Sequence, residues 1–226
     1  MKIVGISDLH GYLPENIKKC DILIIAGDLF PLNCQCDIKK CEEWFNKTFC
    51  KWCNKVDASI IIVVAGNHDF YFEKNSQKHI YEIIASNNLI NKVIYLQDEM
   101  YEYNGLKIYG CPWCTGPNGW AFSPNQQNAD INLFYQAIPD CDILICHQPP
   151  KIDKVGCSYP YKPYEIDYGS YALRSVIEQK NIKYVFCGHI HSGIHGGVEY
   201  NNTMIYNVSL KDEDYRVDYK PTEVII

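Results

Sequence analysis

Short apolar segments of this sequence repeatedly end in aspartate, asparagine or histidine side chains. The polar residues at these ends are Asp8, His10, Asp28, Asn67, His147, His189 and His191. Carboxylate oxygen, amide oxygen and imidazole nitrogen are the ligand atoms that divalent transition metals use in proteins. Two metal ions about 3.5–4 Å apart need a ligand that joins them, and a carboxylate can do so. The set therefore predicts a two-metal site.

Each of these residues also has a structural explanation when taken alone. Asp8 can cap a helix, Asp28 can lie in a turn, and Asn67 can hold a left-handed backbone. A single histidine is more often a surface or core residue than a ligand. The grouping favours the metal site, because five of the seven histidines belong to these motifs: His10, His68, His147, His189 and His191. For His79 and His195, which lie outside them, we expect structural roles.

The motifs also occur in a distinctive order. They are Asp8-Leu9-His10, Gly27-Asp28, Gly66-Asn67-His68-Asp69, His147 and Gly188-His189-Ile190-His191. In this order they resemble the signature blocks of the calcineurin-like metallophosphoesterase superfamily. Asp-x-His and Gly-Asp are weak signals alone, whereas all five blocks in order are very specific. The resemblance extends from residue 1 to about residue 209, where Tyr206-Asn207-Val208-Ser209 resembles the strand after the last metal motif.

The resemblance implies a division of the ligands between two divalent ions. The first ion is held by Asp8, His10 and His191. The second is held by Asn67, His147 and His189, and Asp28 bridges the two. Mn²⁺ is the favoured ion, with Fe, Zn, Ni and Co as alternatives. Asp28 is also the carboxylate most central in the order, and the neutral oxygen of Asn67 leaves net positive charge for a phosphate.

The resemblance further implies that His68, Asp28 and Asn67 are the catalytic residues. A hydroxide that bridges the metals attacks phosphorus, and His68 protonates the leaving oxygen as general acid, a task that suits the pKa of imidazole. Some relatives carry an aspartate three residues after the bridging one, which orients this histidine. Here Pro31 stands at that position. The residue that orients His68 is therefore open, with Asp69 as a guess.

The strands that would carry these motifs are β-branched and apolar on both faces, which is typical of strands buried in a layered α/β domain. They span residues 2–7, 21–26, 59–65, 141–146 and 183–187. Helices are predicted at residues 37–55, 77–86 and 171–180, hairpins at 101–110 and 193–208, and a closing strand at 222–226. Loops at 71–77 and 111–128 would flank the site. We predict an α/β sandwich of two mixed β-sheets flanked by helices, as in the family.

Length and charge limit the remaining possibilities. With 226 residues, we expect one domain over residues 1–226. The formal charge of −6 argues against an extended nucleic-acid or membrane surface. The first apolar run is too short for a signal peptide, and no stretch approaches ~20 apolar residues. We therefore expect a cytoplasmic protein, and the sequence leaves its oligomeric state open.

Twelve cysteines are many for such a protein. The closest pairs are Cys34 with Cys36, Cys50 with Cys53, and Cys111 with Cys114. They can form a zinc or redox site, but their spacing matches a paired zinc motif poorly. We therefore favour reduced thiols without a metal.

The substrate is a small phosphoester by this interpretation, with a phosphodiester favoured because arginines are few: Arg174 and Arg216. The alternatives are a phosphomonoesterase or phosphoprotein phosphatase with the same metals, a non-catalytic scaffold, and a cysteine-based module. Aromatic residues in the loops can stack a nucleobase or aryl group, or can simply pack at the rim. They are Tyr71, Phe72, Trp113, Trp120, Phe122 and residues 159–164.

Overall fold

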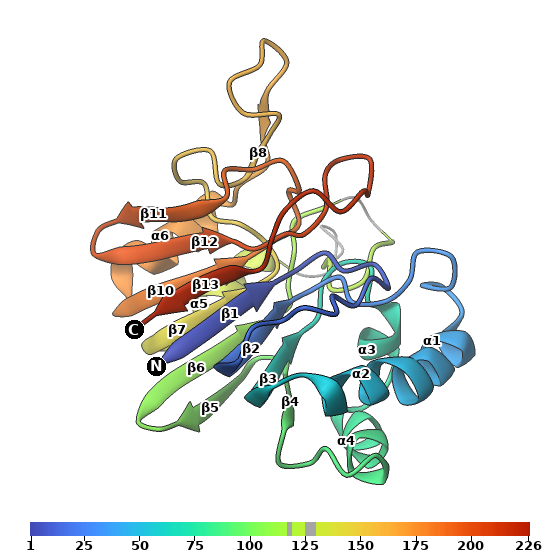
Figure 1. Ribbon diagram of the computed structural model, residues 1–226. Helices are drawn as coiled ribbons and strands as arrows, with labels where there is room; N and C mark the ends of the chain where they lie inside the picture. Colours follow the sequence, from blue (N-terminus) through green and yellow to red (C-terminus); the bar gives the residue numbers. More distant parts are fainter. Residues whose placement is uncertain (117–118, 125–129) are drawn as a thin grey trace.

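Two β-sheets lie face to face at the centre of the protein (Figure 1). The computed structural model describes residues 1–116, 119–124 and 130–226. The first sheet consists, in spatial order, of β13 (Thr222–Ile225), β1 (Lys2–Ile6), β2 (Cys20–Ala26), β3 (Ala58–Val64) and β4 (Val93–Leu96). Strands β1 to β4 are parallel, and β13 pairs antiparallel with β1 at the edge. The predicted closing strand is therefore confirmed.

The second sheet contains the two predicted hairpins at its edges. Its order is β11 (Gly196–Tyr200), β12 (Thr203–Asn207), β10 (Ile182–Cys187), β7 (Cys141–Cys146), β6 (Leu106–Cys111) and β5 (Glu99–Tyr103). The four inner strands are parallel, whereas β5 and β11 run antiparallel to their neighbours. Both sheets are mixed, as predicted.

Apolar side chains fill the space between the sheets. Ile22, Ile24 and Ile62 from the first sheet meet Ile143 and Phe186 from the second in one fully buried cluster. The other faces of the same strands pack against helices. This double burial explains why the inner strands carry mostly apolar residues on both faces rather than an alternating pattern.

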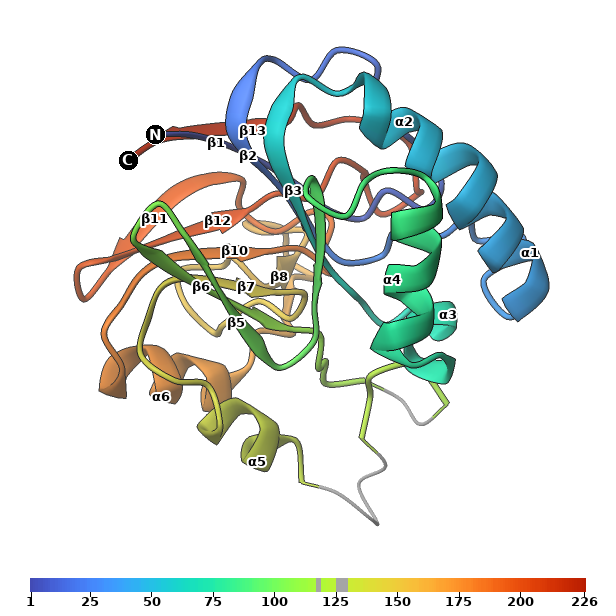
Figure 2. The ribbon, with the colours of Figure 1, turned by 90° about the horizontal axis from the view of Figure 1, so that it is seen from below.

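Helices cover the outer face of each sheet (Figure 2). The first sheet is covered by α1 (Ile38–Trp44), a π-helical turn (Phe45–Phe49), α2 (Cys50–Lys55), α3 (Phe70–Lys74) and α4 (Gln77–Ser86). The second is covered by α5 (Ile131–Gln136) and α6 (Tyr171–Gln179). Asp37, Ser76 and Ser170 cap α1, α4 and α6 by accepting hydrogen bonds from the first-turn amides Lys40, His79 and Leu173.

The structure corrects the sequence prediction in three places. Residues 71–77 are partly helical, because α3 occupies Phe70–Lys74. The helix predicted over 37–55 is interrupted by the π-helical turn, where Phe45 stacks on Phe49. Helix α5 was not predicted. A small ribbon, β8 (Cys157–Ser158) with β9 (Ile166–Asp167), projects from the body. Residues 117–118 and 125–128 of the predicted 111–128 loop lie outside the described residues.

Within the described ranges, no helix is both long and apolar enough to cross a bilayer.

Candidate metal centre and phosphate site

The candidate ligands come together where the parallel strands of both sheets end. Asp8 follows β1, Asp28 follows β2, and Asn67 follows β3 in the first sheet. His147 follows β7 in the second sheet, and His189 and His191 follow β10. Because the sheets face each other, these strand ends form one site with a wall from each sheet.

The backbone at this site is unusual. Asp8, His10, Asp28 and His189 all have left-handed conformations, with φ of 56°, 43°, 54° and 68°. Such conformations cost roughly 1–3 kcal/mol each for residues other than glycine and cluster at functional sites. The strain turns these side chains out of the strand direction and toward one another.

Two glycines make room for the buried carboxylates. A side chain at Gly66 would overlap the Asp28 carboxylate and the ring of His147. A side chain at Gly188 would overlap the Asp8 carboxylate. Gly66 is thus required by the close approach of Asp28 from its own sheet and His147 from the opposite sheet, and Gly188 by the close approach of Asp8 from the opposite sheet.

Asp28 is the point where the candidate ligands converge. Its Oδ2 lies 3.2 Å from His147 Nε2, 3.7 Å from His10 Nε2 and 3.9 Å from His68 Nε2. His10 belongs to one implied metal site and His147 to the other. The position of Asp28 between them suits a bridging carboxylate.

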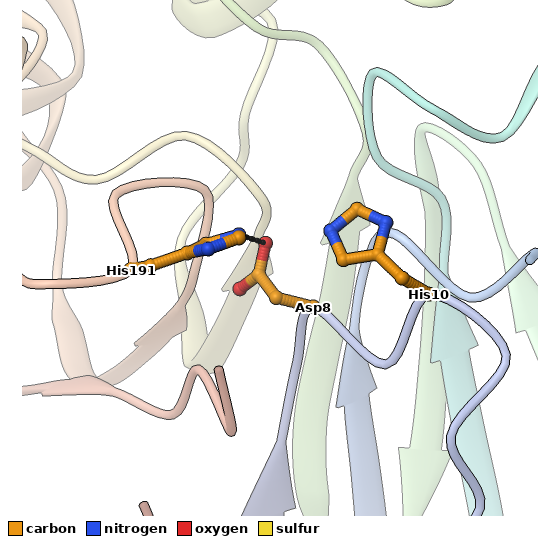
Figure 3. A group of neighbouring side chains, drawn as sticks. All are labelled: Asp8, His10 and His191. Atoms are coloured by element: carbon orange, nitrogen blue, oxygen red, sulfur yellow. Dashed lines mark ion pairs between the residues drawn. The ribbon is translucent and has the colours of Figure 1, made fainter. Parts of the chain in front are cut away.

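Asp8 is a second point where candidate ligands meet. Its Oδ1 lies 3.3 Å from His191 Nε2, the ion pair drawn in Figure 3, and 3.9 Å from His147 Nε2. Asn67 Oδ1 lies 3.1 Å from His147 Nε2. The ring of His189 is 5.2 Å from that of His147.

The donor set fits divalent metal ions. The ligand atoms of Asp8, His10 and His191 lie within 4.8 Å of one another, and so do those of Asp8, Asp28 and His147. Asp8 belongs to both groups, although the family pattern assigns it to the first ion alone. His189 and Asn67 lie beside these groups.

His10 provides a further indication of a missing partner. Both of its ring nitrogens are buried without a hydrogen-bond partner among the described residues. Buried polar groups are almost always paired, so an unpaired imidazole needs an explanation. A metal ion bound to His10 would supply that partner.

Backbone carbonyls fix the orientation of two of the histidines. Nδ1 of His147 donates to the carbonyl of Ala26 at 2.8 Å, and Nδ1 of His191 donates to the carbonyl of Asp212 at 2.8 Å. In each case Nε2 faces the carboxylates. Such bonds hold metal-binding imidazoles in the required tautomer.

Burial and charge set the protonation of the metal-free site. Burial lowers the pKa of His10 to about 3 and that of His189 to about 4, so both rings are neutral at pH 7. Burial also opposes the charged form of His147 and His191. The carboxylates of Asp28 and Asp8 nevertheless raise the pKa of His147 to about 10 and that of His191 to about 9. Binding of metal would replace these two protons.

The His68 side chain points toward Asp28, and Gln35 orients the His68 ring. Gln35 Oε1 accepts a hydrogen bond from His68 Nδ1 at 2.5 Å, which leaves Nε2 facing Asp28. The guess that Asp69 orients His68 is wrong. The Asp69 carboxylate instead accepts hydrogen bonds from the amides of Leu29, Phe30 and Gly66, and so ties the loop after β2 to the loop after β3.

The segment after β12 completes the cavity. The Tyr215 ring lies 4.9 Å from that of His10 and 5.1 Å from that of His191. The Glu213 carboxylate accepts hydrogen bonds from the amide and hydroxyl of Ser192. Both residues line a cavity of about 120 Å³ with Asp28, Asn67, His68, His189 and His191. Sequence reasoning missed Gln35, Glu213 and Tyr215, since no motif marks them.

The two remaining histidines lie outside the centre, as predicted. His79, on α4, contacts Glu42 at 2.7 Å. His195 is held by the carbonyls of Gly193 and Ser209 and stacks on Tyr219.

The twelve cysteines are free thiols. The groupings of potential metal ligands found among the described residues contain no cysteine. Burial raises the pKa of Cys53, Cys111 and Cys114, so these thiols are poor metal ligands and weak nucleophiles at neutral pH. The arrangement favours the interpretation as reduced thiols.

The loop aromatics have several different surroundings. Tyr71, Phe72 and Phe122 are core residues, and Trp113 packs on Phe134 and donates to Asp98. Residues 159–164 belong to the projecting β8–β9 ribbon. Of the aromatic residues singled out from the sequence, Trp120 contacts the centre, with its ring 4.4 Å from that of His68.

Proteins of known sequence are similar to this chain over most of its length. The chain is 31% identical over 243 residues to UPF0046 protein C25E10.12 of Caenorhabditis elegans, covering 98% of this chain and 79% of that protein. It is 29% identical over 244 residues to metallophosphoesterase domain-containing protein 1 of Homo sapiens, covering 95% of this chain and 68% of that protein.

Solved structures share the fold. Phosphopantetheinyl hydrolase from Mycobacterium tuberculosis superposes with a TM-score of 0.60 at 13% identity, covering 95% of this chain and 90% of that one. At this identity the similarity concerns the fold alone.

The family model for calcineurin-like phosphoesterases matches residues 1–193, which contain every candidate metal ligand of the two sheets. The chain therefore belongs to the calcineurin-like phosphoesterase family.

Proposed function

We propose that this protein hydrolyses a small phosphodiester at a two-metal centre. The proposal depends on the convergence at Asp28 Oδ2 of nitrogen atoms from His10, His147 and His68 within 3.9 Å. Two of these residues are candidate ligands from opposite sheets, and the third is a candidate acid. When bound, the ions would act as Lewis acids that neutralise phosphoryl oxygens and activate water.

The residues of the chain have distinct tasks in this proposal. Asp8, His10 and His191 would hold one ion, Asn67, His147 and His189 the other, and Asp28 both. In its imidazolium form, His68 would give the proton on Nε2 to the leaving oxygen and become neutral, keeping the Nδ1 proton that it donates to Gln35. Mn²⁺ is the favoured ion, and we propose that residues 1–226 act as one unit in the cytoplasm.

The test begins with protein stripped by a chelator. Hydrolysis of bis(p-nitrophenyl) phosphate should be absent, should return on addition of Mn²⁺, and should saturate near two ions per chain. His79→Ala is the matched control, since that histidine lies on α4 outside the centre. A metal-loaded protein that hydrolyses neither phosphodiesters nor phosphomonoesters would instead support the scaffold alternative.

A further inference from the structure

A second, larger cavity opens beside the metal centre. It has a volume of about 330 Å³ and shares Asn67 and His189 with the centre. Its other walls include Cys114, Trp120, Tyr168 and Ile190; two hydroxyl residues and a glycine complete the lining. Cavities that bind small organic molecules typically measure roughly 300–1,000 Å³, so there is room for one ring system.

The described lining of this cavity carries no lysine, arginine, aspartate or glutamate. A charged group placed against such a surface would lose hydration without gaining a partner. An apolar, planar group would instead gain contact with the Trp120 and Tyr168 side chains. The chemistry of the walls therefore selects an uncharged aromatic group.

The cavity adjoins the proposed general acid. Trp120 lines it and also contacts His68, with ring centres 4.4 Å apart. His68 would protonate the oxygen that leaves phosphorus. The organic group attached to that oxygen must therefore extend past His68, and Trp120 is the surface that it meets there.

Hydrogen bonds hold the walls in place. Gln148, fully buried after β7, accepts hydrogen bonds from the amide and hydroxyl of Thr115 at 2.8 and 2.7 Å. Its Nε2 donates to the carbonyl of Tyr168 at 2.9 Å, so one side chain joins both walls. The turn that carries Trp120 is anchored by the Ala121 amide, which donates to the Asn67 carbonyl at 3.1 Å. The cavity is thus preformed, which lowers the entropic cost of binding.

We propose that this cavity binds the leaving group of the substrate, and that this group carries an uncharged aromatic ring such as an aryl group or a nucleobase. This inference rests on the proposed hydrolase function, because only a substrate that is hydrolysed has a leaving group. The binding itself needs no turnover and is tested separately.

Calorimetry on metal-free protein provides this test. The probes are 2-naphthylmethanol and adenosine, which are uncharged aromatic alcohols, and 6-(hydroxymethyl)-2-naphthoate, which carries a carboxylate at the far end of the ring. We expect a neutral probe to bind and the naphthoate to bind at least tenfold more weakly. The neutral probe that binds more tightly identifies the aromatic class. Failure of both neutral probes, or equal binding of the naphthoate, would overturn the proposal.

Variants locate the bound probe. Trp120→Ala should weaken binding by about 5- to 150-fold, the range for loss of one base–aromatic stack. Tyr168→Ala, at a side chain that is 49% exposed, should also weaken binding and covers the case in which Trp120→Ala does not fold. Tyr161→Ala, on the projecting ribbon and 74% exposed, is the control and should bind as the wild type does. Unchanged binding in both wall variants would refute the assignment.

Kinetics on the metal-loaded protein then separate the two proposals. The ratio of kcat/KM for a naphthylmethyl phosphodiester over its ethyl analogue should fall in Trp120→Ala relative to wild type. An unchanged ratio would show that the cavity does not bind the leaving group. Absence of any hydrolysis by the wild type would overturn the proposed function and leave the binding result intact.

Discussion

His68 differs from the other histidines of the centre in its partners. Its Nδ1 is bonded to Gln35, its backbone amide donates to Asp28 Oδ1 at 2.8 Å, and its ring touches Trp120. Burial lowers its pKa, an effect that the Asp28 carboxylate opposes. These contacts hold the ring beside the metal ligands without making it one of them.

We therefore expect His68→Ala to keep its metal ions and lose turnover according to the leaving group. General acid catalysis contributes about 10²–10⁴-fold, so the loss of kcat should reach that range for alkyl esters. A nitrophenolate needs little protonation and should leave with a much smaller penalty. The measurement compares both substrates and includes metal analysis of the variant. Equal losses on both would assign His68 a different role.

Gln35 should act through His68 rather than on the substrate. Gln35→Leu removes the acceptor at Nδ1 and should lower kcat for alkyl esters about tenfold, the equivalent of one hydrogen bond of ~1.4 kcal/mol. KM and the rate with nitrophenyl esters should change little. Gln35→Glu keeps an acceptor of the same length and should restore part of the loss. Gln179→Leu, at an exposed position near the end of α6, is the control. A KM effect of the same size as the kcat effect would indicate a role in substrate binding instead.

The sequence predicted the proposed ligands but not the residues that contact and orient the side chains of the centre. Each candidate ligand lies within four residues of the end of a strand, so its motif can be recognised from the local sequence. Gln35 is 33 residues away from His68, in a loop without a motif, and the contact exists only because the chain folds back. Tyr215 likewise depends on how the last segment crosses the centre. Such partners become visible only when the tertiary arrangement is known.

At the scale of elements, the centre joins the two sheets. Asp8, Asp28 and Asn67 come from the first sheet, whereas His147, His189 and His191 come from the second. Bound metal would therefore link the carboxyl ends of both sheets, where the metal-free protein has two buried carboxylates and two protonated histidines. The free energy of metal binding at this point therefore adds to the free energy of unfolding of the whole sandwich.

We expect Mn²⁺ to raise the melting temperature of the wild type by about 5–10 °C. At a free Mn²⁺ concentration of about a hundred times Kd, binding adds roughly 2.7 kcal/mol to the free energy of unfolding, and this corresponds to a shift of that size. Asp28→Ala should lose both ions by metal analysis, because the bridging carboxylate serves both. It should also lose the rise in melting temperature. Asp57→Ala, at an exposed aspartate, is the control and should behave as the wild type does. Retention of two ions in Asp28→Ala would contradict the bridging assignment.

The elements themselves were predictable where the pattern was long. Buried parallel strands carry mostly apolar residues on both faces, and Asn104-Gly105 and Asn201-Asn202 mark the hairpin turns with left-handed backbones. Helices α3 and α5 escaped prediction because they have five and six residues, too few for a periodic pattern. They are helical because their aromatic side chains Tyr71, Phe72 and Tyr135 are buried against the sheets.

At the scale of the whole molecule, charge bears on the choice of substrate. The protein has a formal charge of −6, and several of its cationic side chains form ion pairs away from the centre. Arg216 pairs with Asp212 and Asp214, Lys74 with Glu73, and Arg174 with Glu178 on α6. Lys151, one of the lysines near the site in sequence, pairs with Asp167. The described residues that line the 120 Å³ cavity include no lysine or arginine.

This distribution predicts a preference for phosphodiesters. A monoester dianion carries one more negative charge than a diester and usually needs a cationic side chain besides the metals. Here the side chain at the rim is Glu213, which is partly exposed and repels a dianion. The value of kcat/KM should therefore be higher for bis(p-nitrophenyl) phosphate than for p-nitrophenyl phosphate with the same metal. Glu213→Gln keeps an oxygen that can accept from Ser192 but removes the charge. It should raise the relative rate on the monoester about 2- to 5-fold, as expected for a partly screened charge of ~0.5–1 kcal/mol. Preference of the wild type for the monoester would overturn this argument and would point to a lysine, such as Lys162, that closes over the phosphate.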